Sequence, residues 1–365
     1  MKLPPELLLL LSVLQPATAI PIDSRTPSLT QRSASFRALH GLTHLSNDYS
    51  NPESFSHPTK FFHESTFSGH YDGRFASTEL PHHTRLFHLR LLLKAYMDTM
   101  DRIGVRSWLM HGCLLGWWWN GRIMPWDNDI DLMVDERGMS ELGNWWNMSV
   151  HHFSAQDLGV QDALEADTVV LDTRAEDERL GKRTMHQEVL DTGKKYLLEV
   201  NPHYTNTSTE DRENRIDARW IDTATGLFID ITTVHVQPPS SPSTSTSSSH
   251  TTLYTKDHHT YLTPQIFPLR TSVFENITVH IPFAYESLLL DEYGPKAITS
   301  RVYRKFRFDE ERREWLRVDE FGEEVAEEDE EVVMERLRAA RERMDYLERV
   351  GERQRLGLSR FGDAP

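Results

Sequence analysis

The feature that most constrains this chain is one acidic segment, residues 111–134, which reads HGCLLGWWWNGRIMPWDNDIDLMV. Its second half places three carboxylates at alternate positions: Asp127, Asp129 and Asp131. Alternate side chains of a β-strand share one face, so the intervening Ile130 and Leu132 would face a core. This pattern predicts a strand that gathers carboxylates on one side, where they can hold a hard divalent cation such as Mg²⁺. The alternative is a solvated acidic turn before a buried strand.

Several residues upstream of the carboxylates are candidates for substrate binding. Small residues at Gly112 and Gly116 would let a helix start approach a phosphate closely. Arg122 lies between these glycines and the carboxylates, where a guanidinium suits a diphosphate, unless it is a surface arginine. His111 either faces a donor phosphate or is a satisfied histidine at a strand end. We also include Trp126, which immediately precedes the first aspartate.

The same segment contains three tryptophans in a row, Trp117–Trp119, and the single cysteine of the chain, Cys113. The tryptophans should form core on one side, which leaves one ring able to stack on a base or a sugar. A helix start can lower a thiol pKa, but a buried small residue is the simpler interpretation of Cys113. One cysteine excludes an intramolecular disulfide.

Together these motifs resemble the LicD/fukutin nucleotidyltransferase-like family, whose hallmark is G-x-L-L-G at a helix start, an arginine, and then P-W-D-x-D-I-D. Within that family the chain is most similar to fungal mannosylphosphate-transfer proteins of the secretory pathway. The resemblance covers roughly Pro81 to Phe306. It implies an α+β fold of the nucleotidyltransferase (polymerase-beta) type, in which helices flank a mixed sheet.

A later segment, residues 215–232, is predicted to form two strands joined by a turn at 223–226. Asp230 stands between two isoleucines in the second strand, so its side chain faces away from them. A later strand of this kind supplies the third metal carboxylate in the family, and Asp230 matches it, although it could also face solvent on an edge strand. The resemblance thus implies Asp129, Asp131 and Asp230 as ligands of Mg²⁺ or Mn²⁺, with Asp127 as an outer ligand or a base.

Composition divides the chain into four parts. A basic start, a short apolar run and Ala17-Thr-Ala19 are typical of a signal peptide. A stretch rich in Ser, Thr, Pro and His follows, and a highly charged tail with an amphipathic helix ends the chain. The expected parts are a signal peptide at 1–19, a stem or loosely ordered arm at 20–80, a LicD-like domain at 81–306 with a Ser/Thr-rich insertion at 237–252, and a tail at 307–365.

Regular elements are also expected outside the acidic segment, from apolar periodicity. Helices are predicted at 84–103, 112–120, 287–293 and 333–347. Strands are predicted at 106–110, 168–172, 195–200 and 267–281. The last helix either docks on the core or pairs with a partner subunit.

The signal peptide points to the secretory pathway, with the Golgi lumen or secretion as destinations. Glycosylation sequons at Asn147, Asn206 and Asn276 support that route. No other apolar run approaches 18 residues, so no transmembrane helix is expected after signal removal. A net charge of −16 argues against a nucleic-acid partner. Adjacent histidines diverge on a helix or a strand, so the pairs at 82–83, 151–152 and 258–259 predict no zinc site by themselves.

Three functions are compatible with these residues. The resemblance implies an enzyme that moves mannose-1-phosphate from GDP-mannose, a nucleotide-sugar donor, onto a hydroxyl of a glycoprotein glycan. A lumenal regulator or accessory subunit of the same transfer would be free to lose the carboxylates. A glycan-binding module that uses the tryptophans would need neither the carboxylates nor a metal.

Overall fold

The structure is a computed structural model that describes residues 48–50, 60–160, 187–238, 251–318 and 330–357. All of them belong to one compact unit. The signal peptide at 1–19, the strand at 168–172 and most of the insertion at 237–252 lie outside the described residues.

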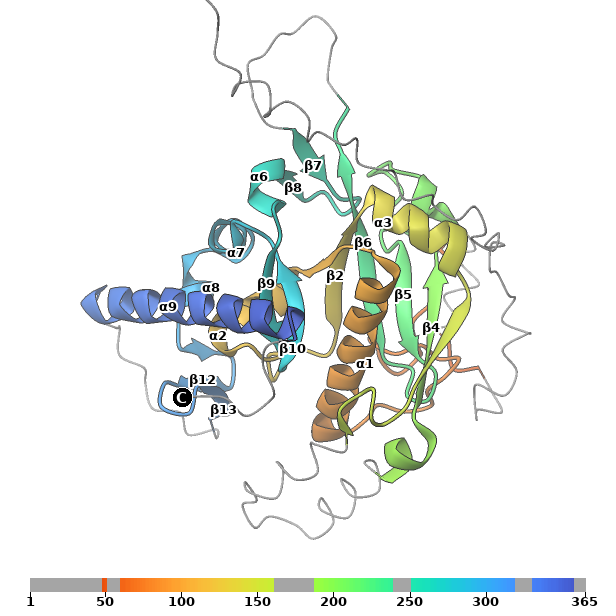
Figure 1. The fold of residues 1–365 in the computed structure, drawn as a ribbon, viewed down its shortest axis with the longest axis horizontal. Coiled ribbons are helices and arrows are strands. Elements are labelled where there is room, and N and C mark those ends of the chain that lie inside the picture. The colour runs from red at the N-terminus through yellow and green to blue at the C-terminus, as the bar shows by residue number, and fades with distance from the viewer. Residues whose placement is uncertain (1–47, 51–59, 161–186, 239–250, 319–329, 358–365) are drawn as a thin grey trace, which may run out of the picture. The chain divides into compact units, whose positions relative to one another are not determined.

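A mixed sheet forms the centre of the structure (Figure 1), and its strands run in the order β1-β2-β6-β5-β4-β3. β7 and β8 extend it from β6. Only the β2–β6 pair is parallel among the pairs of this sheet in the described residues. The strands are β1 (Ser107–Leu109), β2 (Ile130–Asp135), β3 (Ser149–Phe153), β4 (Lys194–Val200), β5 (Ala218–Asp222), β6 (Phe228–Val236), β7 (Thr252–Tyr254) and β8 (Thr260–Leu262).

Helix α1 (His82–Ile103) covers one face of this sheet, over β5 and β6 (Figure 1). Its apolar positions recur at helical spacing, and Leu89, Leu92 and Tyr96 are fully buried. The hydroxyl of Tyr96 hydrogen-bonds to Ser107 of β1 at 2.8 Å, which ties the helix to the edge of the sheet. The α+β architecture, a mixed sheet flanked by helices, is therefore confirmed.

The segment at 267–281 was expected to be one strand, but it forms a hairpin of β9 (Arg270–Phe274) and β10 (Ile277–Ile281). Glu275 and Asn276 form the turn, and both have positive φ, at 51° and 61°. Two successive residues in this conformation make the tight turn that suits a hairpin, and asparagine tolerates it well. The β10 strand packs beside β1.

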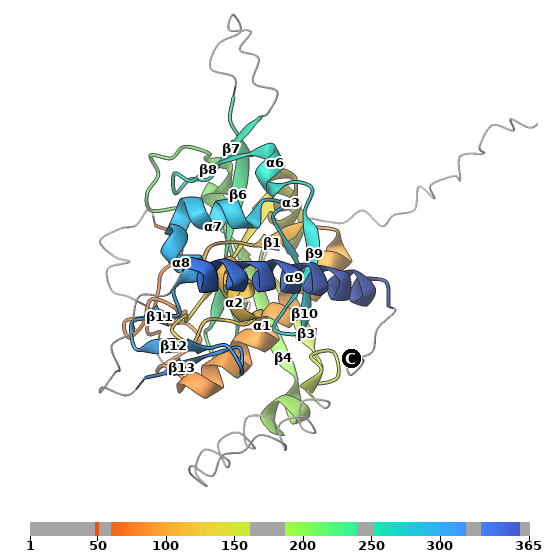
Figure 2. The same cartoon turned by 90° about the vertical axis from the view of Figure 1, so that its left-hand side faces the viewer.

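Helix α9 (Glu330–Arg355) lies across this hairpin in both views (Figures 1 and 2). Met344 is buried there, and Leu337 and Leu347 pack against the core. The predicted amphipathic helix is confirmed, and it docks on the core of its own chain.

Two expected boundaries need correction. Residues 60–80 were assigned to a loose arm, yet Tyr71 and Phe75 are buried, and Asp72 accepts a hydrogen bond from Arg74. The tail was expected to begin at 307, yet the strands β12 (Phe306–Asp309) and β13 (Glu314–Arg317) place Phe308 and Trp315 in the core. Phe75 is buried against apolar side chains of the sheet, and Phe308 and Trp315 are buried against the ring of Trp119.

The remaining elements are short. They are α3 (Glu136–Glu141), a π-helical turn (Leu142–Trp146), a 3₁₀ turn (Pro202–Thr205), α6 (Thr263–Ile266), α7 (Tyr285–Tyr293), α8 (Pro295–Thr299), β11 (Val302–Tyr303), β12 (Phe306–Asp309) and β13 (Glu314–Arg317). Helix α2 (His111–Asn120) packs on β2 and on α7. Within the described ranges, no helix combines the length and the apolar character that crossing a bilayer requires.

Candidate functional site

Two aspartates meet at the centre of the sheet, where β2 and β6 run parallel. The register pairs Asp131 directly with Asp230, because Ile130 pairs with Ile229 and Leu132 with Ile231. The four apolar neighbours are fully buried, so the two carboxylates face the other side of the sheet. The pairing brings together two candidate residues that are 99 positions apart in the sequence.

The other two aspartates precede the strand. β2 begins at Ile130, so Asp127 and Asp129 lie in the connection from α2, and the prediction that all three carboxylates share one strand is wrong. The connection turns back on itself, with the amide of Asp127 donating to the carbonyl of Met124 at 2.9 Å. A side-chain hydrogen bond joins Asp127 to Asp129. The carboxylates therefore converge through a turn rather than through alternation alone.

The two glycines of α2 make room for this connection. A Cβ on Gly112 would lie 2.6 Å from Oδ2 of Asp127, and one on Gly116 would lie 2.5 Å from the carbonyl oxygen of Arg122. Real Cβ atoms essentially never come this close, so any side chain would displace the carboxylate turn. Approach of a phosphate to these glycines stays a prediction.

Two cationic partners at the site were not predicted from the sequence. Nε of Arg219 donates to Oδ1 of Asp230 at 2.7 Å, and the same guanidinium donates to Glu64 at 3.0 Å. Nδ1 of His70 lies 3.2 Å from Oδ2 of Asp129. Arg219 could have been found, because the 223–226 turn sets a register in which it pairs with Asp230. No local motif marks His70.

Burial and mutual repulsion perturb the carboxylates. Burial, the hydrogen bond with Asp129 and the nearby charges raise the pKa of Asp127 to about 8. Burial and the charges of Asp129 and Asp230 raise the pKa of Asp131 to about 7. Burial also acts on Asp129, but hydrogen bonds with His70 and Asp127 outweigh it and lower the pKa of that carboxyl. Burial raises the pKa of Asp230, against the opposing effect of Arg219.

This donor set fits a hard divalent cation. The four aspartates supply oxygen ligands, which Mg²⁺ and Mn²⁺ prefer. Among the described residues, no lysine or arginine forms an ion pair with Asp131, and Asp230 shares Arg219 with Glu64. The site thus holds an excess of negative charge that a bound cation would relieve.

His111 lies close enough to Asp131 for the two charges to interact. Arg122 points elsewhere. Arg122 is largely exposed, and its guanidinium donates to Glu314 of β13 at 2.7 Å. Trp126 is half-buried, with its ring against those of Tyr303 and Phe306 at centroid distances of 4.8 and 5.1 Å. The positions of Arg122 and Trp126 therefore indicate packing of β11–β13 onto the acidic segment.

The tryptophan run is core. Trp117, Trp118 and Trp119 are at most 4% exposed, and their indole nitrogens donate to Ser272, Ile298 and Ala297. The expected free ring for stacking on a base or sugar is not found in the structure. Burial raises the pKa of the Cys113 thiol well above its usual value, which agrees with a buried small residue.

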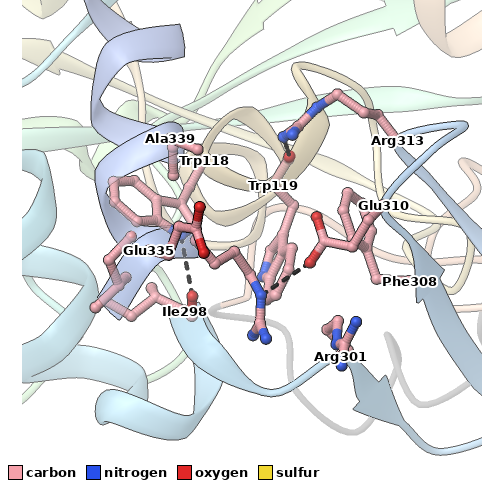
Figure 3. A pocket seen from close by; sticks show the side chains of 12 residues that line it. Trp118, Trp119, Ile298, Arg301, Phe308, Glu310, Arg313, Glu335 and Ala339 are labelled. Atoms are coloured by element: carbon pink, nitrogen blue, oxygen red, sulfur yellow. Dashed lines mark hydrogen bonds and ion pairs between the residues drawn. The ribbon is translucent and has the colours of Figure 1, made fainter. Parts of the chain in front are cut away.

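A cavity of about 310 Å³ lies between α2, α8, β12 and α9 (Figure 3). Trp118 and Trp119 line it together with charged side chains. Arg336 forms an ion pair with Glu310 across it at 2.8 Å, and Arg313 donates to the carbonyl of Trp119 at 2.9 Å. None of the aspartates lines this cavity, so its shape says nothing about the carboxylate chemistry.

The sequons differ in accessibility. Asn206 and Asn276 are exposed. Asn147 is half-buried, and its side-chain oxygen accepts a hydrogen bond from the amide of Val200 at 2.9 Å. Glycan attachment therefore stays a prediction at all three positions, with Asn147 the most constrained.

The site thus has one aspartate on each of two parallel strands and two more on the connection from a glycine-containing helix. Residues 104–180 match the family described as LicD/FKTN/FKRP, nucleotidyltransferase domain. This stretch of the chain is thus similar to the nucleotidyltransferase domain of that family, as its motifs indicated.

Two curated relatives come from Saccharomyces cerevisiae (strain ATCC 204508 / S288c). The chain is 30% identical over 183 residues to Mannosyltransferase regulator 4 and 30% identical over 178 residues to Mannosyltransferase regulator 14. Each match covers 47% of this chain, but only 13% and 15% of the respective relatives. The chain therefore corresponds to a small part of those proteins.

Proposed function

We propose that this protein is a metal-dependent phosphotransferase with a nucleotidyltransferase-type fold, which moves a sugar phosphate from a nucleotide-activated donor onto a glycan hydroxyl. The observation that carries the proposal is the in-register pair of Asp131 and Asp230 beside Asp127 and Asp129. A structural cluster of this kind would be costly, because like charges repel and burial penalises each of them.

The chain's residues would divide the work as follows. Asp129, Asp131 and Asp230 would hold Mg²⁺ or Mn²⁺. The cation would neutralise the negative charge that develops on the phosphate oxygens. Arg219 fixes the rotamer of Asp230 and neutralises its charge in part. His70 orients Asp129. Asp127, whose pKa is about 8, is mostly protonated at neutral pH, so it would assist as an outer ligand that hydrogen-bonds to Asp129.

The proposed donor and acceptor are those that the family resemblance implies, and the relatives' names mention mannosyl transfer. GDP-mannose is the proposed donor, mannose-1-phosphate the transferred group and a mannose of a glycoprotein glycan the acceptor. A location in the secretory-pathway lumen is part of the proposal, and the exposed sequons at Asn206 and Asn276 are compatible with it.

The direct test incubates the purified full chain with a panel of nucleotide-sugars, a mannose oligosaccharide and Mn²⁺, followed by mass spectrometry. The expected product gains one mannose phosphate, a mass that hydrolysis or plain mannose transfer cannot produce. Omission of metal and replacement of Asp131 by Asn are the controls. Absence of any phosphorylated product with every donor would contradict the enzymatic proposal.

A second candidate function is regulation, which the printed names of both relatives favour. In that case the chain would bind a transferase or its donor in the lumen without catalysing transfer itself. Calorimetry with GDP-mannose and Mn²⁺ distinguishes the two when read together with the product assay. Binding without product would support a regulator, whereas product formation by the chain alone would exclude a purely regulatory role.

A further inference from the structure

Three potential metal ligands converge from segments far apart in the chain. His111 is the first residue of α2, His259 lies in the loop between β7 and β8, and Glu292 is near the end of α7. One ligand atom from each lies within 4.8 Å of the other two. Nδ1 of His111 is 2.7 Å from Oε1 of Glu292, and the two imidazole centroids are 5.0 Å apart.

The loop that carries His259 is anchored on both sides of the imidazole. Nζ of Lys256 forms an ion pair with Asp217 at 2.5 Å, and both side chains are 1% exposed. The ring of His259 lies parallel to that of Tyr261, with an angle of 3° between the planes. Nε2 of His259 is 3.6 Å from a carboxylate oxygen of Asp257, which can orient the ring as carboxylates do behind metal-bound histidines.

The backbone at His111 is also unusual. Its φ of 52° places a non-glycine residue in the left-handed region, directly at the first residue of a helix. Such a conformation is unfavourable for an L-residue and tends to occur at functional sites. Here it accompanies a side chain that reaches Glu292, 181 positions away in the sequence.

We propose that His111, His259 and Glu292 bind a divalent transition metal, with Zn²⁺ as the best fit, at a site separate from the four aspartates. Two imidazole nitrogens and one carboxylate oxygen are a typical donor set for zinc, and three protein ligands leave one position for water or a substrate oxygen. Hard cations such as Mg²⁺ favour the all-oxygen set of the aspartates instead.

The geometry needs only a small adjustment. Tetrahedral coordination at about 2.0–2.1 Å separates neighbouring ligand atoms by roughly 3.3 Å. The 2.7 Å contact between His111 and Glu292 must therefore open slightly, and any ligand atoms that lie as far as 4.8 Å apart must approach each other. Binding releases the proton that His111 and Glu292 share in the hydrogen bond, since neutral imidazole and ionised carboxylate are the coordinating forms.

The proposed zinc site borders the carboxylate site. His111 is followed by Gly112, where the Cβ of any other residue would touch Asp127. An ion at this position would hold the start of α2, the end of α7 and the β7–β8 loop together next to the aspartates. It would also add positive charge beside a region of excess negative charge.

The test is zinc binding to the full chain after removal of metal with a chelator. Isothermal titration with Zn²⁺ and the shift in melting temperature are measured for wild type, His259→Asn and Glu292→Gln. Each of these variants should bind one zinc ion fewer than wild type, or bind it at least about tenfold more weakly. His258→Asn is the matched control, because His258 is exposed, adjacent and outside the cluster, and asparagine tolerates its φ of 74°.

Equal stoichiometry and affinity in wild type and in both ligand variants would overturn the proposal and leave His111 and Glu292 as an ion pair only. Circular dichroism checks the fold, and either variant suffices if the other fails to fold. Asp131→Asn separates this site from the proposed function. It should keep zinc binding while losing Mn²⁺-dependent transfer, so each hypothesis can fail without the other.

Discussion

Asp217 directly precedes β5 and Asp222 ends it, and each of them is buried beside a lysine of its own chain. Asp131 in β2 has no such lysine beside it among the described residues. Lys256 lies 2.5 Å from Asp217, and Lys194 lies 2.5 Å from Asp222. Asp131 instead faces the like charges of Asp129 and Asp230.

The difference separates two uses of a buried carboxylate. A carboxylate that serves the fold has a cation supplied by the chain, because an unpaired buried charge is strongly destabilising. Among the described residues, the four aspartates of the site share only Arg219 and His70, which contact Asp230 in β6 and Asp129 in the turn before β2. Their surplus charge is therefore suited to an external cation, and the predictions below test this distinction.

The largest effect is expected from Asp129→Asn and Asp131→Asn in the transfer assay. Each change keeps the shape of the side chain but removes a charge that would face the cation. Loss of such a ligand should lower the rate on the order of a thousandfold, about 4 kcal/mol. The melting temperature without metal should hold or rise, because repulsion within the cluster decreases. Normal transfer in both variants would rule out the site as catalytic.

Lys256→Met should instead cause a large loss of folding stability. It leaves Asp217 buried without its cation, and breaking a buried pair from one side costs about 3–5 kcal/mol. Denaturant unfolding measures this loss. Lys94→Met is the control, since the Lys94–Asp98 pair is about one-third exposed and should contribute under about 1 kcal/mol. Similar losses in the two variants would show that burial does not distinguish these pairs.

The pH dependence of stability should report the surplus charge directly. Aspartate in the unfolded chain titrates near pH 4, whereas the folded pKa is about 8 for Asp127 and about 7 for Asp131. Between these pH values the folded state binds more protons than the unfolded state. Both groups therefore make the stability of the metal-free protein fall as pH rises from about 4 to 8. Melting temperatures of wild type and Asp131→Asn should therefore diverge with rising pH, in favour of the variant. Parallel curves would contradict the raised pKa of Asp131.

The smallest effect is expected from Asp127→Asn. The protonated carboxyl of Asp127 hydrogen-bonds to Asp129, and an amide can donate in the same way. Transfer should stay within about tenfold of wild type at pH 7, roughly 1.4 kcal/mol. A loss as large as that of Asp131→Asn would make Asp127 an essential ligand or base.

The sequence by itself determined the local elements and the candidate carboxylates. Helical spacing of leucines predicted α1, and the turn at 223–226 predicted the β5–β6 hairpin, since both depend on neighbours along the chain. The acidic segment and Asp230 were identified from their residues and from the family resemblance. The amphipathic pattern also predicted α9, although it left open what the helix packs against.

Only the tertiary structure decided which side chains meet. The parallel register of β2 and β6 places Asp131 beside Asp230, and no periodicity in either strand specifies that register. His70 reaches Asp129 from a segment without a motif, and His259 reaches His111 from a histidine pair that predicted no metal site. Contacts across long loops depend on how the whole core packs, so local sequence patterns carry little information about them.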